Sequence, residues 1–157
     1  YLTAGDATVC CMSYGSIKAK QYALEKWFGI VNVYYKNRVI ANSVIWINEP
    51  YNCLVLDNIE VHPNYTVYNQ ILKICFRTAA EQLMKQYQVG WVVQGTCYND
   101  LILYNDEQIE IRFPMMKPKE VQLKTFYSDA VKCKLVCEKE PNTGINSLVS
   151  NIYLSAA

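Results

Sequence analysis

The fold of this chain is decided by Cys53-Leu54-Val55-Leu56-Asp57-Asn58-Ile59-Glu60-Val61-His62-Pro63. The first half of this stretch is apolar, which is typical of a central strand covered on both faces. Pro63 has no backbone N–H and ends the strand, and a helical pattern follows from about Gln70 to Tyr87. A strand that splays here and feeds a helix leaves unpaired N–H groups near one point, where an anion can bind. An acyl carrier with a pyrophosphate would suit that point.

Three runs rich in β-branched and aromatic residues precede the long helix, at Ile30 to Tyr35, Val39 to Ile47 and Cys53 to Val61. The connections between them are too short to hold crossover helices, so the runs predict an antiparallel meander. Asn69 is the expected N-cap of the helix. The helix carries an apolar stripe at three- and four-residue steps, made of Ile71, Leu72, Ile74, Cys75, Ala79, Leu83 and Met84.

The remaining elements are shorter. Upstream, the pattern predicts a strand near Thr8 to Met12 and an amphipathic helix from Ser16 to Phe28. Downstream, it predicts strands at Val89 to Val93, Ile109 to Phe113 and Lys132 to Glu138, and a helical turn at Asp100 to Tyr104. This order predicts an α+β fold with a mixed, mostly antiparallel sheet, helices on both faces and one parallel step across the long helix. Residues 1–140 are expected to form one domain, and 141–157 a tail or linker.

Composition narrows the function classes. A formal net charge of +1 without a dense Lys/Arg run gives no support to nucleic-acid binding. Seven cysteines, an odd number without a Cys-x-x-Cys pair, predict reduced thiols in the cytoplasm and no metal site. No apolar run reaches the ~18 residues of a membrane helix, so a soluble protein is expected. Tyrosine, with 13 residues, is the one outlier.

The segment from Leu56 to Pro63 resembles the Leu-x-x-Ile-x-Val-x-Pro strand of the GNAT superfamily of N-acetyltransferases. In that family the strand leads through a glycine-containing pyrophosphate loop into a long helix, and the likeness in element order spans roughly Thr8 to Glu138. The opening Gly5-Asp6-Ala7-Thr8-Val9-Cys10-Cys11 is similar to a signature that we associate with GNAT-like domains of large phages and other mobile elements. The resemblance implies transfer of an acetyl group from acetyl-CoA to an amine on a small molecule or a protein.

Such a transfer needs a base for the ammonium proton and an acid for the departing thiolate. Glu60 is the candidate base, because an extended strand projects it beside His62 at the expected cleft; a solvated or ion-paired strand residue is the alternative interpretation. The resemblance implies that Tyr104 is the acid and that Asn99 belongs to the cofactor site. Main-chain contacts to acetyl-CoA are expected at Ile59, Val61, Tyr65, Thr66, Val67, Tyr68, Asn69 and Gln70.

The turn departs from the family pattern, since residues 64–70 contain no glycine. Glycine lets the backbone approach a phosphate and adopt positive φ, whereas Tyr65, Val67 and Tyr68 bring bulk and β-branching. Two hypotheses therefore stand together. The first is an N-acetyltransferase with an atypical pyrophosphate loop. The second is a non-catalytic GNAT-like module for protein contacts, for example in a phage or mobile-element assembly, which the many tyrosines favour.

Overall fold

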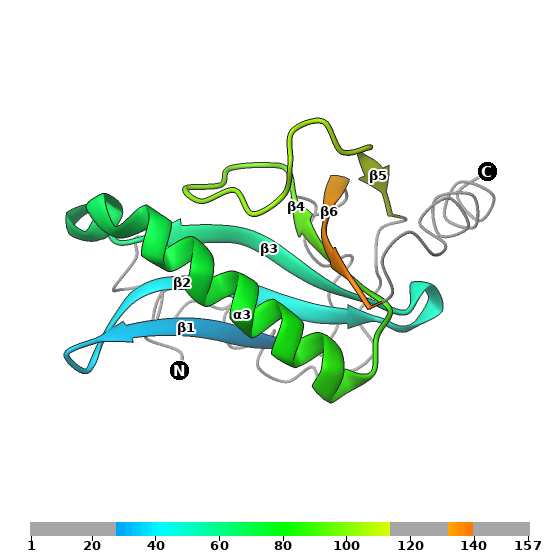
Figure 1. The fold of residues 1–157 in the computed structure, drawn as a ribbon, viewed down its shortest axis with the longest axis horizontal. Helices are drawn as coiled ribbons and strands as arrows, with labels where there is room; N and C mark the ends of the chain where they lie inside the picture. Colours follow the sequence, from blue (N-terminus) through cyan, green and yellow to red (C-terminus); the bar gives the residue numbers. More distant parts are fainter. Residues whose placement is uncertain (1–27, 114–131, 140–157) are drawn as a thin grey trace, which may run out of the picture.

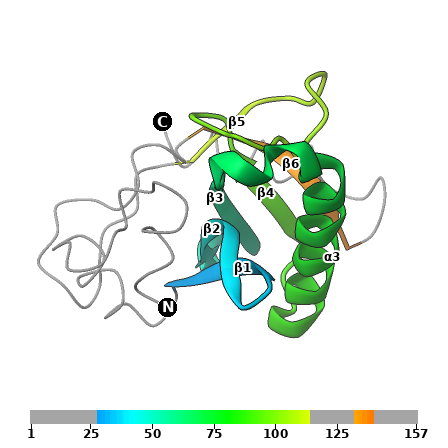
Figure 2. The ribbon, with the colours of Figure 1, turned by 90° about the vertical axis from the view of Figure 1, so that its left-hand side faces the viewer.

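The computed structural model describes residues 28–113 and 132–139. There, six strands form one open sheet in the order β1-β2-β3-β4-β6-β5, and the long helix α3 covers one of its faces (Figures 1 and 2). The strands are β1 (Phe28–Tyr35), β2 (Arg38–Asn48), β3 (Cys53–Val61), β4 (Trp91–Gly95), β5 (Ile111–Arg112) and β6 (Lys132–Glu138). Two 3₁₀ helices, η1 (Glu49–Tyr51) and η2 (Pro63–Tyr68), flank β3, and α3 spans Asn69–Tyr87. The fold is α+β, as the sequence predicts.

Several expected elements lie outside the described residues. These are the strand near Thr8 to Met12, the stretch from Gly5 to Cys11, and all of the helix from Ser16 except its last residue. That residue, Phe28, opens β1. The expected tail, residues 141–157, also lies outside them.

The predicted meander is confirmed. β1 runs antiparallel to β2, and β2 antiparallel to β3. The β1/β2 hairpin turns at Lys36 and Asn37, which have φ angles of 46° and 62°. Two consecutive positive φ values are typical of a type I′ turn, whose twist matches that of the flanking strands.

Helix α3 differs from the prediction in two details. Asn69 is its first residue rather than its N-cap, because the chain arrives as the η2 helix and the Asn69 N–H bonds to the carbonyl of Thr66. The buried face carries Leu72, Phe76, Ala80 and Met84 at steps of four. Ile71 and Ile74, which belong to the predicted apolar stripe, are 60% and 65% exposed.

The long helix carries the chain from β3 to β4, and these two strands are parallel, so the predicted parallel step is confirmed. The core lies between α3 and the sheet, where Phe76 and Leu72 meet Leu54, Leu56 and Ile59 of β3. Residues 100–104 form no helical turn, contrary to the prediction, because their backbone groups bond to a buried side chain of β4 instead of to one another. Within the described ranges, no helix is both long and apolar enough to cross a membrane.

Candidate functional site

The candidate site lies where β3 and β4 separate. The two strands pair only from Cys53↔Trp91 to Leu56↔Gln94; β4 then ends at Gly95, while β3 continues to Val61. At the same point the register between β3 and β2 shifts, because Leu56 to Ile59 oppose only Ile45 to Ser43. Such a β-bulge bends the strand that carries it. The second half of β3 thus turns away from β4 and gives up its strand neighbour on that side.

The loop after β4 lies along the second half of β3, on the side where β4 no longer pairs with it. We call residues 96–103 the covering loop. Asn99 Oδ1 accepts a hydrogen bond from the Ile59 N–H (3.0 Å), and Asp100 Oδ2 accepts one from the Val61 N–H (3.0 Å). The Asp100 N–H donates to the carbonyl of Ile59 (3.0 Å). Two side chains and one amide therefore bond to β3 in the pattern that a neighbouring strand would use.

Gln94, at the end of the paired part of β4, holds the covering loop in place. Its side chain is fully buried. Nε2 donates to Asn99 Oδ1 and to the Leu101 carbonyl, both at 2.9 Å, and Oε1 accepts from the Leu103 N–H at 2.9 Å. Asn99 also donates to the Gly95 carbonyl, and the Arg77 guanidinium of α3 donates to the Leu103 carbonyl. The loop is thus tied to β3, β4 and α3 together.

The turn after β3 uses its backbone groups locally. The Asn64 N–H donates to His62 Nδ1 (3.2 Å) and the Tyr65 N–H to the His62 carbonyl (2.8 Å). Thr66 Oγ1 donates to the Pro63 carbonyl. Residues of a 3₁₀ helix pair their N–H groups with carbonyls three positions back. The N–H groups of this turn are therefore directed along the segment and bonded within it.

Aromatic rings surround the turn. The Tyr65 ring lies 5.4 Å from His62, 6.0 Å from Tyr35 and 6.3 Å from Tyr68, measured between ring centroids. Lys36 Nζ lies 5.3 Å from the centroid of the Tyr35 ring. These contacts join η2 to the tip of the β1/β2 hairpin.

Of the predicted cofactor residues, the structure brings Ile59 and Asn99 together through a hydrogen bond, and Val61 lies beside them. Tyr65, Thr66, Val67 and Tyr68 form η2, and Asn69 and Gln70 begin α3. Val67 is 81% exposed. Sequence reasoning did not find Gln94 or Asp100; the only local signal was a polar residue at the end of the apolar run Trp91 to Val93.

The two predicted catalytic residues lie apart. Glu60 sits opposite Asn42 of β2, and because Ile59 and Val61 enter the core under α3, Glu60 points to the other face of the sheet. Tyr104 lies against β6, with Lys134 Nζ 5.3 Å from its ring centroid. Burial, followed by the charge of Asp106, raises the pKa of Tyr104, which makes it a weaker proton donor. Strand β4 stands between β3 and β6.

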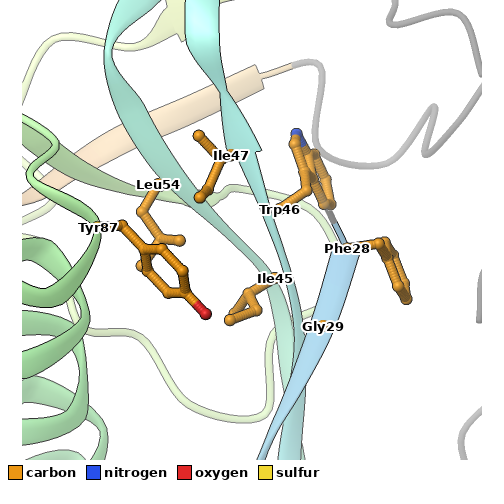
Figure 3. Close-up of a pocket in the computed structure, with 7 residues that line it drawn as sticks. All are labelled: Phe28, Gly29, Ile45, Trp46, Ile47, Leu54 and Tyr87. Atoms are coloured by element: carbon orange, nitrogen blue, oxygen red, sulfur yellow. The ribbon is translucent and has the colours of Figure 1, made fainter. Parts of the chain in front are cut away.

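A small apolar pocket opens between the β1/β2 pair and the end of α3 (Figure 3). Its volume is about 60 Å³, far below the ~300 Å³ at which ligand pockets usually begin. Tyr87 of α3 reaches toward Ile45 and Leu54, whereas Phe28 and Trp46 lie together at the opposite side of the strands (Figure 3). The pocket is a packing gap at the edge of the core and has no room for a coenzyme.

Among the described residues, no cluster of His, Cys, Asp and Glu could hold a metal ion, and Cys53, Cys75, Cys97, Cys133 and Cys137 are free thiols. Comparison of the chain with known protein families, curated proteins and solved structures finds no match.

Proposed function

We propose that this chain is a non-catalytic protein-interaction module on a GNAT-like scaffold. The scaffold assignment rests on the Leu56 to Pro63 motif and the α3 crossover between parallel β3 and β4. In this proposal the sheet carries helices on both faces, and the protein works in the cytoplasm. Its partner is another protein, and residues 5–11 favour a phage or mobile-element assembly.

One observation carries the non-catalytic assignment: on the edge of β3 that β4 does not pair with, the backbone N–H groups already donate to Asn99 and Asp100. An acyl carrier lying along this edge would compete with three hydrogen bonds of the covering loop. If each contributes about 1 kcal/mol, the competition costs about 3 kcal/mol, which weakens binding roughly 100-fold. The bond from Val61 to the Asp100 carboxylate is charge-assisted and raises this cost further.

The turn after β3 supports the same conclusion. A diphosphate needs several N–H groups aimed at one position. Residues 64–70 contain no glycine. Residues 63–68 form the 3₁₀ helix η2, in which the Asn64 and Tyr65 N–H groups bond to His62. This turn therefore presents exposed side chains to a partner, and not backbone N–H groups.

A second candidate function is transfer of an acetyl group from acetyl-CoA to an amine, with Glu60 as base and Tyr104 as acid. The observation that favours it is the separation of β3 from β4 at a bulge, a geometry that opens the sheet beside a helix N-terminus. This function requires the covering loop to leave β3 when the coenzyme binds.

A thermal-shift titration with acetyl-CoA and free coenzyme A separates the two candidates. We expect no stabilisation of the native chain at millimolar ligand. Binding at 100 times the dissociation constant would add about 2.7 kcal/mol to the free energy of unfolding, and a shift of that size in the native chain overturns the proposal. The variant Asn99→Ala/Asp100→Ala is the matched control: a shift that appears only in this variant identifies the covering loop as the obstacle.

A further inference from the structure

The turn that lacks phosphate-binding geometry presents an exposed apolar surface. The tip of the β1/β2 hairpin lies at one end of the described sheet, next to η2 and the start of α3 (Figure 1). We call their large exposed side chains, together with the Tyr65 ring that links η2 to the hairpin, the aromatic patch: Tyr35, Tyr65, Val67, Tyr68, Ile71 and Ile74. Grouped apolar side chains of this kind mark interaction sites, whereas single ones are ordinary.

Ring contacts link two of the elements that carry the patch. Tyr65 contacts the rings of both Tyr35 and Tyr68 and so fixes η2 against the hairpin. Ile71 and Ile74 lie three residues apart on α3, on one side of the helix, and are 60% and 65% exposed. Tyrosines contribute large contact areas at low cost in conformational entropy. The surface therefore offers anchors for the apolar side chains of a partner.

Within the described ranges, the charged residues closest in sequence to the patch are basic. Lys36 and Arg38 flank Tyr35, and residues 28–48 and 61–80 contain no Asp or Glu. Glu60 points to the other face of the sheet, opposite Asn42, and Asp100 lies across β3, where its carboxylate accepts from the Val61 N–H. Interfaces match charges of opposite sign, so this surface favours a partner that carries carboxylates.

The side chains distinguish a polypeptide partner from a nucleic acid. Single-stranded nucleic acids stack their bases on aromatic rings in a basic groove. Here Val67, Ile71 and Ile74 add aliphatic surface, which bases do not cover well but which apolar side chains do.

We propose that the aromatic patch binds an acidic, amphipathic polypeptide segment. Its apolar side chains cover Tyr68, Ile71 and Ile74, and its carboxylates face Lys36 and Arg38. The inference rests on the proposed function, because it gives the chemistry of that function's partner.

The test uses two synthetic helical peptides with the same Leu/Phe stripe, one flanked by Glu and the other by Lys. Fluorescence anisotropy at low salt measures their binding to the full chain. The acidic peptide binds at least ~10-fold more tightly, and the difference shrinks toward parity at high salt. In Lys36→Glu/Arg38→Glu the preference reverses. Ile71→Ser/Ile74→Ser weakens both peptides, whereas Ile109→Ser, an equally exposed isoleucine outside the patch, changes neither.

Three results would overturn the inference: equal or absent binding of the two peptides, tighter binding of an oligo-dT strand, or self-association of the chain alone that Ile71→Ser/Ile74→Ser abolishes. The last result would mean that a second copy covers the patch. The coenzyme titration stays independent of these outcomes. If acetyl-CoA stabilises the chain and the acidic peptide also binds selectively, the non-catalytic assignment is wrong. The proposal that the aromatic patch binds an acidic segment is then still supported.

Discussion

Gln94 shows how a single buried amide organises the candidate site. Its side chain makes three hydrogen bonds to the covering loop, at Asn99, Leu101 and Leu103. A buried amide that is hydrogen-bonded in this way stabilises the fold. Its removal would take a hydrogen-bond partner from each of three polar groups of the loop. The geometry of the covering loop therefore depends on this residue, together with Asn99, which bonds to both β3 and β4.

The substitution Gln94→Leu is expected to lower the free energy of unfolding by roughly 2–4 kcal/mol, because it strands a buried carbonyl and a buried N–H. Urea denaturation measures the loss. Gln82→Leu, on the exposed side of α3, is the matched control and should stay within about 0.5 kcal/mol of the native chain. Equal effects of the two substitutions would contradict the structural role of Gln94.

Two buried thiols make the stability sensitive to alkaline pH. Burial raises the pKa of Cys53 well above its ordinary value of 9.0, and burial, with Cys53 nearby, does the same for Cys133. A thiol whose folded pKa exceeds its unfolded pKa contributes stability that is complete below about pH 9 and is lost as the pH rises.

Each such thiol should reduce the free energy of unfolding by up to about 1.4 kcal/mol per pH unit above 9. Cys53→Ala removes one of them, so its stability curve should fall less steeply than that of the native chain between pH 9 and 10.5. Denaturation at a series of pH values gives both slopes. Parallel curves would show that Cys53 does not keep its proton in the folded state.

At the scale of elements, the β1/β2 hairpin depends on its turn. Asn37, at φ 62°, occupies a region that glycine and asparagine tolerate and β-branched residues avoid. Asn37→Val should cost about 1–2 kcal/mol of stability, whereas Asn37→Gly should stay close to the native value or exceed it. Thermal denaturation of both variants checks this. A valine variant as stable as the glycine variant would exclude the type I′ turn.

Elements with strong local patterns were predictable. The bounds of β3 and β6 match the prediction residue for residue, because their β-branched and apolar runs end at clear breaks. The spacing of Ile71 and Ile74 did not show that they are exposed, since apolar residues at helical spacing can lie on a buried or on an exposed face.

The covering loop could not be predicted from local patterns. Its bonds to β3 join residues about 40 positions apart, such as Ile59 and Asn99, and side-chain bonds to a distant backbone leave no periodic signal. The sequence did place Ile59, Val61 and Asn99 at one site, and the structure brings them together. What the sequence did not show is that the side chains of Asn99 and Asp100 themselves bond to the backbone of β3.

At the scale of the whole molecule, the sheet opens at one place and the chain closes that opening itself. The tip of the hairpin, η2 and the start of α3 lie at the same end of the sheet (Figure 1), and these elements carry the aromatic patch. We therefore propose that this scaffold, with a filled slot and an exposed apolar end, holds a protein partner and does not turn over a coenzyme. Fold alone does not assign function, so this conclusion depends on the filled slot.

Hydrogen exchange at the Ile59 and Val61 amides, with and without millimolar acetyl-CoA, tests that claim most directly. In the native chain we expect both amides to be protected already and to be unchanged by the coenzyme, because Asn99 and Asp100 accept their hydrogen bonds. In Asn99→Ala/Asp100→Ala they should exchange roughly 10-fold faster or more, since each amide loses an acceptor worth about 1.4 kcal/mol or more. Amides that exchange freely in the native chain and become protected only when acetyl-CoA is added would contradict the account.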